Sequence, residues 1–368
     1  MIKLDILLQE MPERNASDLF LKAGSRPMFR IDNEIEPSDF PEMDVADVRN
    51  TAYSLMSEDQ IRYFEQYHEM DLAVGIRGVG RFRVNVFMQR SSVGMVFRYI
   101  AHPNFTFEEL NLPTGIRDLS ENRRGLVLVT GTTGSGKSTT LAAMINHINN
   151  NRRCHIITIE DPIEFLHHDN LAIINQREIG FDTKNFNEAL KHVLRQSPDV
   201  ILIGEMRDLE TIQTAISASE TGHLVLSTLH TINAVQTVER IINYFPAYLH
   251  PQIRLELSLT LNGVISQRLL PMSSGKGRIP AVELLIATPT IKKLLHEGKT
   301  LELPKYIEAG RDVGMQTFNQ ALFDMYTAGL VKLEDALAYA TSPSEFRLMV
   351  EGIETGTRSK DMHKYELE

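Results

Sequence analysis

Residues 130–140 read T-G-T-T-G-S-G-K-S-T-T, and this stretch decides the fold. It contains the pattern G-x-x-x-x-G-K-[ST] at residues 131–138, directly after a short apolar run and at the start of a predicted helix. Glycines at this position allow backbone N–H groups to surround phosphate oxygens at the positive end of a helix. The alternative is a glycine turn that merely joins a strand to a helix. The strand before the loop and the helix after it favour a nucleotide site.

Each part of the loop has an expected role. The Lys137 ammonium is expected to reach the β and γ phosphates, and the Ser138 hydroxyl is expected to ligate a magnesium ion. The backbone of the glycine-rich turn supplies the remaining donors. The predicted nucleotide-binding residues are Gly131, Thr132, Thr133, Gly134, Ser135, Gly136, Lys137, Ser138 and Thr139.

Composition limits the class of protein. The chain has 368 residues, of which 42% are hydrophobic and 23% are charged, so we expect a globular protein of two domains. The single cysteine, Cys154, excludes an intrachain disulfide and a zinc site built from several thiolates. No apolar run approaches the ~18 residues of a spanning helix, and the N-terminus has no secretory cleavage pattern. We therefore expect a cytoplasmic protein without a transmembrane segment.

Charge argues weakly against a nucleic-acid motor. The formal net charge is -10, with 48 acidic and 38 basic residues, whereas nucleic-acid affinity comes largely from phosphate neutralisation. Residues 72–107 are a local exception, because they contain five arginines and no acidic residue.

The sequence after Gly125 is typical of an α/β domain. Short apolar runs alternate with helical stretches, which indicates a parallel sheet covered by helices. The runs lie at 126–129, 155–159, 200–203 and 223–227, and the clearest helices are predicted at 208–221 and 231–244. Beyond Pro289 only helical periodicity continues, to about residue 350, followed by a polar tail.

The first hundred residues are expected to form a smaller α+β domain. A helix is predicted at 2–11, and residues 80–100 predict a hairpin with its turn at Ser91-Ser92. Period-two alternation places Arg81 and Arg83 on the strand face opposite the apolar side chains. These arginines are candidates to stabilise developing phosphate charge, and the alternative is a solvated arginine face. Residues 101–115 resemble a linker.

Two acidic clusters follow predicted strands. Glu160-Asp-Pro-Ile-Glu164 follows the run at 155–159, and Glu205 follows the run at 200–203, so both clusters are expected at the carboxyl edge of the sheet. One carboxylate can organise magnesium and another can activate water. Asp208 is interpreted as a helix N-cap instead. His223 and His230 flank a further strand, and a polar side chain at a strand end suits γ-phosphate sensing.

Four motifs in order resemble the secretion ATPase superfamily: G-x-x-G-S-G-K-S-T-T, I-E-D-P-I-E, P-D-V-I-L-I-G-E-M-R-D-L-E-T and E-T-G-H-L-V-L-S-T-L-H. The resemblance implies a RecA-like P-loop ATPase domain with an N-terminal PAS-like α+β domain and C-terminal helices, assembled as a homo-hexamer that uses ATP and Mg²⁺. It also implies that 131–138 is the Walker A loop, that Glu164 activates water and that Glu205 is the Walker B acid and a metal ligand. His223 and His230 would form the His box.

Within that superfamily the chain resembles the type IV pilus retraction ATPases, the PilT/PilU family, and its C-terminal region is most similar to the PilU branch. The single cysteine and short N-terminus differ from assembly and secretion relatives, which carry a four-cysteine zinc insertion. Thr290–Glu297 reads T-I-K-K-L-L-H-E where PilT proteins carry A-I-R-N-L-I-R-E. The apolar spacing survives but the arginines do not, which predicts an accessory motor that depends on a PilT-type paralogue.

The expected organisation follows from these motifs. We predict domains at 1–100 and 116–289, a linker at 101–115, a helical region at 290–350 and a polar tail at 351–368. The predicted partners are further copies of the chain, a PilT-type paralogue and an inner-membrane pilus platform protein, with the motor peripheral at the inner membrane. No nucleic-acid partner is expected.

Three other functions are compatible with some of the same residues. A RecA-like helicase or DNA translocase shares the loop and the ring, but the motor domain shows no basic or aromatic DNA-contacting loop. A regulatory subunit that binds ATP and supports a partner ring is disfavoured by the intact acids. A switch GTPase is disfavoured because no N-K-x-D string occurs.

Overall fold

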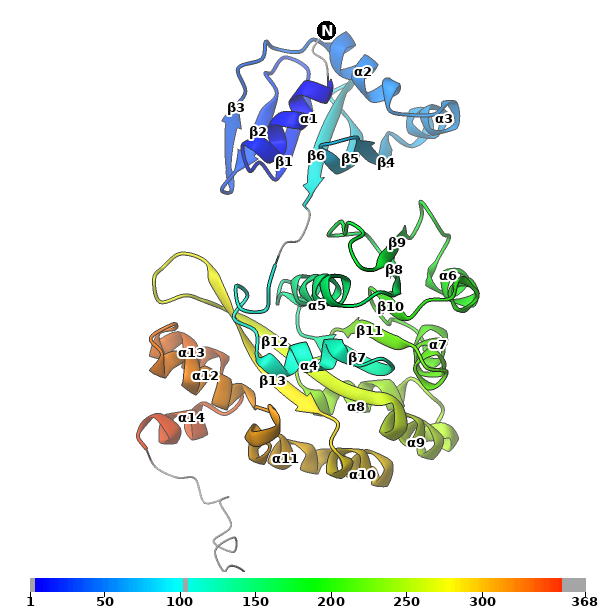
Figure 1. Ribbon diagram of the computed structural model, residues 1–368. Helices are drawn as coiled ribbons and strands as arrows, with labels where there is room; N and C mark the ends of the chain where they lie inside the picture. The colour runs from blue at the N-terminus through cyan, green and yellow to red at the C-terminus, as the bar shows by residue number, and fades with distance from the viewer. Residues whose placement is uncertain (1–3, 102–104, 353–368) are drawn as a thin grey trace, which may run out of the picture. The chain divides into compact units, whose positions relative to one another are not determined.

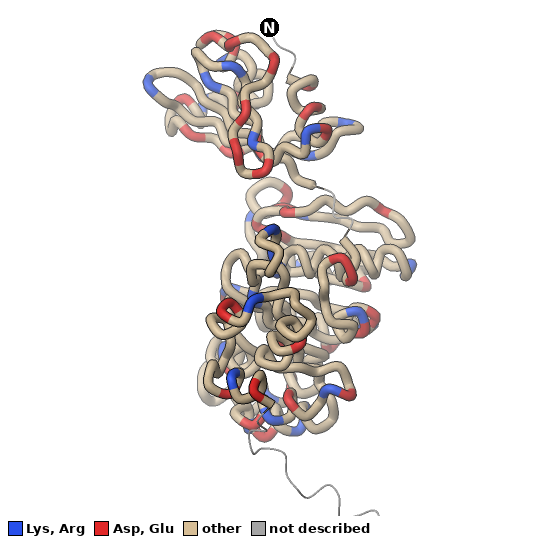
Figure 2. The backbone as a smooth tube through the Cα atoms, turned by 90° about the vertical axis from the view of Figure 1, so that its left-hand side faces the viewer, with Lys and Arg blue, Asp and Glu red and all other residues tan. Residues whose placement is uncertain are grey.

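The computed structural model describes residues 4–101 and 105–352 (Figure 1). Their contacts divide the chain into two compact units. Unit 1 holds the described residues up to Ala101 together with Ile163–Leu166, and unit 2 holds the rest. Acidic and basic residues are interspersed along the backbone of both units (Figure 2). The polar tail predicted at 351–368 falls almost wholly outside the described residues.

Unit 1 consists of one antiparallel sheet and three helices. The six strands lie in the order β3-β2-β1-β6-β5-β4. The strands are β1 (Asp18–Lys22), β2 (Met28–Ile31), β3 (Glu34–Pro37), β4 (Glu69–Ile76), β5 (Gly80–Gln89) and β6 (Ser92–Ile100), and the helices are α1 (Leu4–Glu13), α2 (Val45–Ser54) and α3 (Glu58–Tyr67). The helix predicted at 2–11 corresponds to α1 over its described residues, and α1 continues to Glu13.

The predicted hairpin at 80–100 is confirmed. Strands β5 and β6 pair from Arg81↔Ile100 to Gln89↔Ser92, and the turn residues are Arg90 and Ser91, with φ values of 45° and 62°. The turn therefore lies one residue before the predicted Ser91-Ser92. Two residues of positive φ give the turn whose twist matches an antiparallel pair. Alternation buries Phe82, Val84 and Val86 in the core of unit 1, whereas Met88 is exposed.

The two halves of this sheet meet at strands β1 and β6. Strand β1 pairs with β6 from Asp18↔Arg98 to Lys22↔Gly94. The buried carboxylate of Asp18 accepts a hydrogen bond of 2.9 Å from Nε of Arg98, and its other oxygen lies 3.3 Å from Nε of Arg30. A buried carboxylate is stable here because two guanidinium groups face it.

Unit 2 contains a seven-stranded sheet in the order β13-β12-β7-β11-β10-β8-β9. The strands from β12 to β9 run parallel, and only β13 is antiparallel to its neighbour. The strands are β7 (Gly125–Thr130), β8 (His155–Glu160), β9 (Ile173–Glu178), β10 (Val200–Ile203), β11 (Leu224–Leu229), β12 (Leu261–Pro271) and β13 (Arg278–Ile286). The four predicted strands are β7, β8, β10 and β11, so the predicted α/β class is confirmed.

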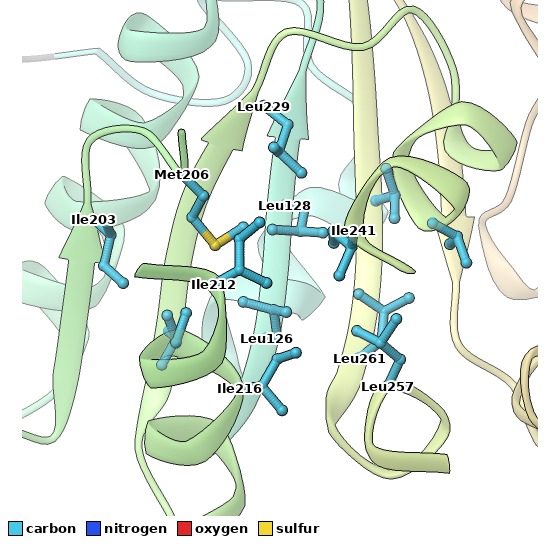
Figure 3. Close-up of a cluster of buried hydrophobic side chains, with 14 of the residues drawn as sticks. Leu126, Leu128, Ile203, Met206, Ile212, Ile216, Leu229, Ile241, Leu257 and Leu261 are labelled. Atoms are coloured by element: carbon cyan, nitrogen blue, oxygen red, sulfur yellow. The ribbon is translucent and has the colours of Figure 1, made fainter. Parts of the chain in front are cut away.

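Helices cover both faces of the sheet, as Figure 1 shows. They are α4 (Thr114–Glu121), α5 (Lys137–Asn151), α6 (Phe186–Val193), α7 (Leu209–Glu220), α8 (Ala234–Asn243) and α9 (His250–Thr260). One apolar cluster packs α7, α8 and α9 against the sheet, and the close-up in Figure 3 shows Ile212 and Ile216 directed at Leu126 and Leu128. A fully buried aliphatic side chain contributes about 1.5–3 kcal/mol to folding. This packing holds the strand ends in register.

The C-terminal part of unit 2 is helical, as predicted beyond Pro289. It consists of α10 (Pro289–Glu297), α11 (Leu303–Ala309), α12 (Phe318–Thr327), α13 (Leu333–Tyr339) and α14 (Pro343–Val350). Helices α12 to α14 pack on the β12–β13 hairpin in an apolar cluster of their own, which includes Phe318 and Phe346. Among the described residues, no helix is long and apolar enough to span a membrane.

Candidate nucleotide-binding site

The glycine-rich loop joins β7 to α5, as its motif requires. Strand β7 ends at Thr130, and α5 begins at Lys137 after Gly136, whose φ is 95°. The Nζ atom of Lys137 donates to the carbonyl oxygens of Gly131 at 3.0 Å and Thr132 at 2.9 Å. The ammonium is therefore held over the loop, where the positive end of α5 favours an anion.

Gly131 is required by its surroundings. Its φ is +145°, and an added Cβ would lie 2.4 Å from Oγ of Ser135 and 2.6 Å from the carbonyl oxygen of Gln267. No larger side chain fits without displacing the loop. Strand β12, which carries Gln267, therefore fixes the loop from one side.

Glu205 lies just beyond β10, at the same sheet edge as the loop. The backbone around it is tied to both neighbouring strands, because Gly204 N–H donates to Ile159 at 2.8 Å and the Thr228 hydroxyl donates to the Gly204 carbonyl at 2.7 Å. The Glu205 side chain is only 20% exposed. Its position at the carboxyl edge confirms the placement expected from the strand order.

A guanidinium group and an imidazole ring contact the Glu205 carboxylate. Nη2 of Arg207 lies 2.8 Å from Oε2, and Nε2 of His230 lies 3.3 Å from Oε1. Arg207 also faces Asp161, with 4.0 Å between Nη1 and Oδ2. This group of Glu205, Arg207 and His230 is called the acid cluster below. Sequence reasoning found Glu205 and His230 but not Arg207.

His223 does not belong to the acid cluster, and its expected role in the His box stays a prediction. It precedes β11, whereas His230 follows it, and the six residues of β11 separate the sheet edges by about 20 Å at 3.3 Å per residue. Nδ1 of His223 lies 2.9 Å from the Ala218 carbonyl at the end of α7. Parallel strands all begin at one edge of the sheet and end at the other. His223 and His230 therefore lie at opposite edges.

Two other acidic residues accept hydrogen bonds from residues close to them in the sequence. Glu160 ends β8 and accepts a 2.6 Å hydrogen bond from the Thr158 hydroxyl. Asp208 caps α7, since its carboxylate accepts from Thr211 N–H at 2.9 Å, which confirms the N-cap interpretation.

Glu164, Arg81 and Arg83 belong to unit 1. Glu164 is exposed, and the two arginines are partly buried on the face of β5 opposite Phe82. Their roles at a nucleotide, like the domain boundaries drawn from the sequence, stay predictions.

A pocket of about 560 Å³ opens beside the loop within unit 2. Gly131–Ser135 form one wall, and a second wall comes from β12, β13, the last two residues of α13 and the two residues that follow it. Sequence reasoning missed this second wall. The missed residues that line it include Gln267, Arg268, Leu269, Arg278, Ala338, Tyr339, Ala340 and Thr341.

Arg268 connects the second wall to the C-terminal helices. Its guanidinium lies 3.8 Å from the centroid of the Phe318 ring and donates to the Tyr339 carbonyl. Burial lowers the pKa of Arg268 below its ordinary value, and Glu283 on the adjacent strand opposes that shift. Burial raises the pKa of Glu283, whose carboxylate accepts a 2.9 Å hydrogen bond from Ala234 N–H.

Comparison with known proteins identifies the family. Residues 1–297 match the family model described as "Type II/IV secretion system protein". The chain belongs to this family. The matched region contains both units' strands, the glycine-rich loop and the acid cluster.

Members of the type II/IV secretion system family with curated names are similar along almost the whole chain. The chain is 46% identical to the type IV pilus ATPase PilU of Pseudomonas aeruginosa, over 95% of this chain and 91% of that protein. It is 45% identical to the type IV pilus retraction ATPase PilT of the same organism, over 92% of this chain and 98% of that protein. A crystal structure of the pilus retraction motor PilT with bound ADP matches with a TM-score of 0.85 and 46% identity, covering 94% of this chain and 99% of that one.

Proposed function

We propose that this chain is an ATP-hydrolysing motor that drives or assists type IV pilus retraction. The observation that carries the proposal is the combination of the glycine-rich loop and the acid cluster at one edge of the sheet in unit 2. Similar proteins of this family are named as pilus ATPases, and one was crystallised with ADP. ATP is the proposed substrate.

The residues of unit 2 divide the proposed chemistry among them. Loop N–H groups and Lys137 would bind the phosphates, and bound magnesium would neutralise charge on the β and γ oxygens. Ser138 and Glu205 would hold the ion, since a hydroxyl and a carboxylate are ligands that magnesium prefers. His230 and Arg207 orient the Glu205 carboxylate. Glu164 would activate water, and Arg81 and Arg83 would contact a nucleotide from unit 1.

We further propose that six copies form a ring at the inner membrane and pass their motion to a platform protein. The substituted segment 290–297 supports an accessory role beside a PilT-type paralogue. Ile291, Leu294 and Leu295 are buried and hold α10 in place, whereas Lys293 and His296 are exposed. The changed charges at these exposed positions would alter coupling to a partner and leave folding intact.

The chemical part of the proposal is tested with three variants in the full chain. Lys137→Ala is expected to abolish tight ATP binding. Glu205→Gln and Glu164→Gln are expected to retain binding and lower turnover by about 10²–10⁴-fold, the usual contribution of a catalytic carboxylate. Equal loss of binding in all three variants would contradict these roles.

The motor part is tested by retraction assays in two deletion backgrounds. Deleting this gene is expected to weaken retraction under load, and expressing it alone in cells without the PilT-type motor is expected to restore little. Full retraction by this protein alone would overturn the accessory role and leave an autonomous retraction motor.

A further inference from the structure

The segment that joins β11 to α8 carries His230 and borders the pocket beside the glycine-rich loop. Nε2 of His230 lies 3.3 Å from Oε1 of Glu205. Ile232 and Asn233, two and three residues further along the chain, line the pocket. The conformation of this segment, residues 230–233, therefore determines how the imidazole meets the Glu205 carboxylate. It is called the histidine segment below.

Local hydrogen bonds join the histidine segment to α8. The side-chain oxygen of Gln236 accepts from Ile232 N–H at 2.8 Å, and the hydroxyl oxygens of Thr231 and Thr237 lie 2.7 Å apart. Asn233 caps the helix, because its side-chain oxygen accepts from Gln236 N–H at 2.8 Å. All of these partners are close in the sequence, so they fix the segment to the helix and not to the rest of the sheet.

Glu283 supplies a contact from a distant part of the sequence. Its carboxylate, on strand β13, accepts a 2.9 Å hydrogen bond from the N–H of Ala234, the first residue of α8. The first N–H groups of a helix have no partner within the helix, and the Asn233 cap takes the N–H of Gln236 instead. A carboxylate is also favoured at the positive end of a helix. Glu283 thus anchors the start of α8 to β13.

The register of the sheet places Glu283 level with the start of the glycine-rich loop. Glu283 pairs with Ser266 on β12, and Ser266 pairs with Thr130, the last residue of β7. A hydrogen bond of 2.9 Å joins the hydroxyls of Thr130 and Ser266, and both residues are buried. Paired residues of neighbouring strands project from the same face of a sheet. Glu283 therefore ties the histidine segment to the row of residues that leads into the loop.

The hairpin that carries Glu283 is in turn joined to the C-terminal helices. Burial raises the pKa of Glu283, and the positive charge of Arg268 on β12 opposes that shift. The Arg268 guanidinium stacks on the Phe318 ring of α12 and donates to the Tyr339 carbonyl at the end of α13. The acceptor for Ala234 N–H is therefore held from both strands of the hairpin.

We infer that Glu283 is a positioning residue for ATP hydrolysis: it holds the start of α8 and so keeps the histidine segment where His230 contacts Glu205. This inference rests on the proposed function, in which the acid cluster acts in hydrolysis. Glu283 acts through His230 and not by contact with the nucleotide. Loss of its acceptor leaves Lys137 and the glycine-rich loop in place, so hydrolysis is impaired and ATP binding is retained.

The test measures steady-state ATP hydrolysis by the full chain, with kcat expressed per folded protein from melting curves. Glu283→Ala removes the acceptor. Glu283→Met also removes it but fills a similar space, which protects the test if the alanine variant does not fold. Glu283→Gln keeps an oxygen for Ala234 N–H. Glu239→Ala is the matched control, because Glu239 is a partly buried carboxylate that joins a later turn of α8 to the Thr300 hydroxyl.

Glu283→Ala and Glu283→Met are expected to lower kcat about tenfold or more, since losing a residue that supports a metal ligand typically costs roughly 10–100-fold. The KM for ATP should change less than about twofold. Glu283→Gln should restore most of the lost activity, and Glu239→Ala should leave kcat nearly unchanged. The inference is overturned by an unchanged kcat in the alanine and methionine variants, by no restoration with glutamine, or by an equal loss in the control.

A double-mutant cycle with His230→Ala shows whether Glu283 acts through the histidine. If it does, the variant that combines Glu283→Ala with His230→Ala should lose little beyond the loss of His230→Ala alone, because the positioned contact is already absent. Losses that multiply would overturn the inference and leave the role of His230 intact. An unchanged turnover in His230→Ala alone would instead overturn the acid cluster of the proposed function, and the positioning role with it.

Discussion

Nε2 of His230 lies 3.3 Å from Oε1 of Glu205, although the two residues follow different strands of unit 2. Neighbouring parallel strands β10 and β11 end at the same sheet edge, so the first residues beyond them meet. The contact orients a carboxylate that is also bound by Arg207, and it links the predicted Walker B acid to the predicted His box.

This contact predicts different outcomes for the two histidines. His230→Ala removes a partner of Glu205, so turnover should fall about tenfold or more while ATP binding persists. His223→Ala is the matched control, because it lies at the opposite sheet edge and supports the end of α7. It should lower the melting temperature and leave turnover per folded protein nearly unchanged. Equal losses of turnover would refute the assignment.

Gly131→Ala should disrupt the glycine-rich loop without unfolding unit 2. The new Cβ would collide with Ser135 and with the Gln267 backbone, so the loop must move and ATP affinity should fall at least about tenfold, equivalent to about 1.4 kcal/mol. Gly222→Ala is the control, since its φ is +105° but an added Cβ there meets nothing within 4 Å. It should cost roughly 1–2 kcal/mol of stability and no affinity. Calorimetric binding and thermal melts measure both effects.

Glu283→Gln should change how stability depends on pH. Burial raises the folded-state pKa of Glu283, so the folded chain binds its proton more tightly than the unfolded chain does. The contribution of Glu283 to stability is therefore present below its unfolded pKa and is lost as pH rises through the folded pKa. The amide keeps an oxygen for Ala234 N–H and does not ionise.

The variant should thus gain melting temperature relative to the wild type as pH rises from about 4.5 upward. Melting curves from pH 4 to pH 8 provide the comparison. A difference between the two proteins that stays constant over this range would show that ionisation of Glu283 does not affect stability.

Arg81→Ala and Arg83→Ala together should lower magnesium-dependent turnover of the assembled protein, if the arginines stabilise developing phosphate charge. Both side chains lie on the polar face of β5, so the buried face should keep unit 1 folded. Arg77→Ala is a control in the turn that connects β4 to β5. Unchanged turnover in the double variant would mean that the two arginines form an ordinary solvated face.

The glycine-rich loop and the acid cluster could be predicted because they depend on local sequence and on strand direction. A motif between an apolar run and a helix fixes Lys137, and two neighbouring runs that end in polar residues bring Glu205 to His230. His223 and His230 are close in the sequence, but the direction of β11 places them at opposite edges of the sheet, so the role of His223 stays a prediction.

The second wall of the pocket was not predicted because its residues come together only in three dimensions. Arg268, Phe318 and Tyr339 are far apart in sequence, and no local pattern indicates a guanidinium between a ring and a carbonyl. The β12–β13 hairpin that carries Arg268 did leave a signal. Residues 273–277 read S-S-G-K-G between two apolar runs, which is typical of a turn joining two strands.

The pairing of β1 with β6 has a consequence for how unit 1 folds. Strands β4, β5 and β6 are consecutive in the sequence, and short turns connect them. The Asp18–Arg98 contact, in contrast, joins residues that are 80 positions apart. Long loops cost more closure entropy and slow the contacts that depend on them. The β4–β6 meander is therefore expected to form early, with β1 to β3 added once Arg98 meets Asp18. In native-state hydrogen exchange, the amides of β2 and β3 should open at a lower free energy than those of β5.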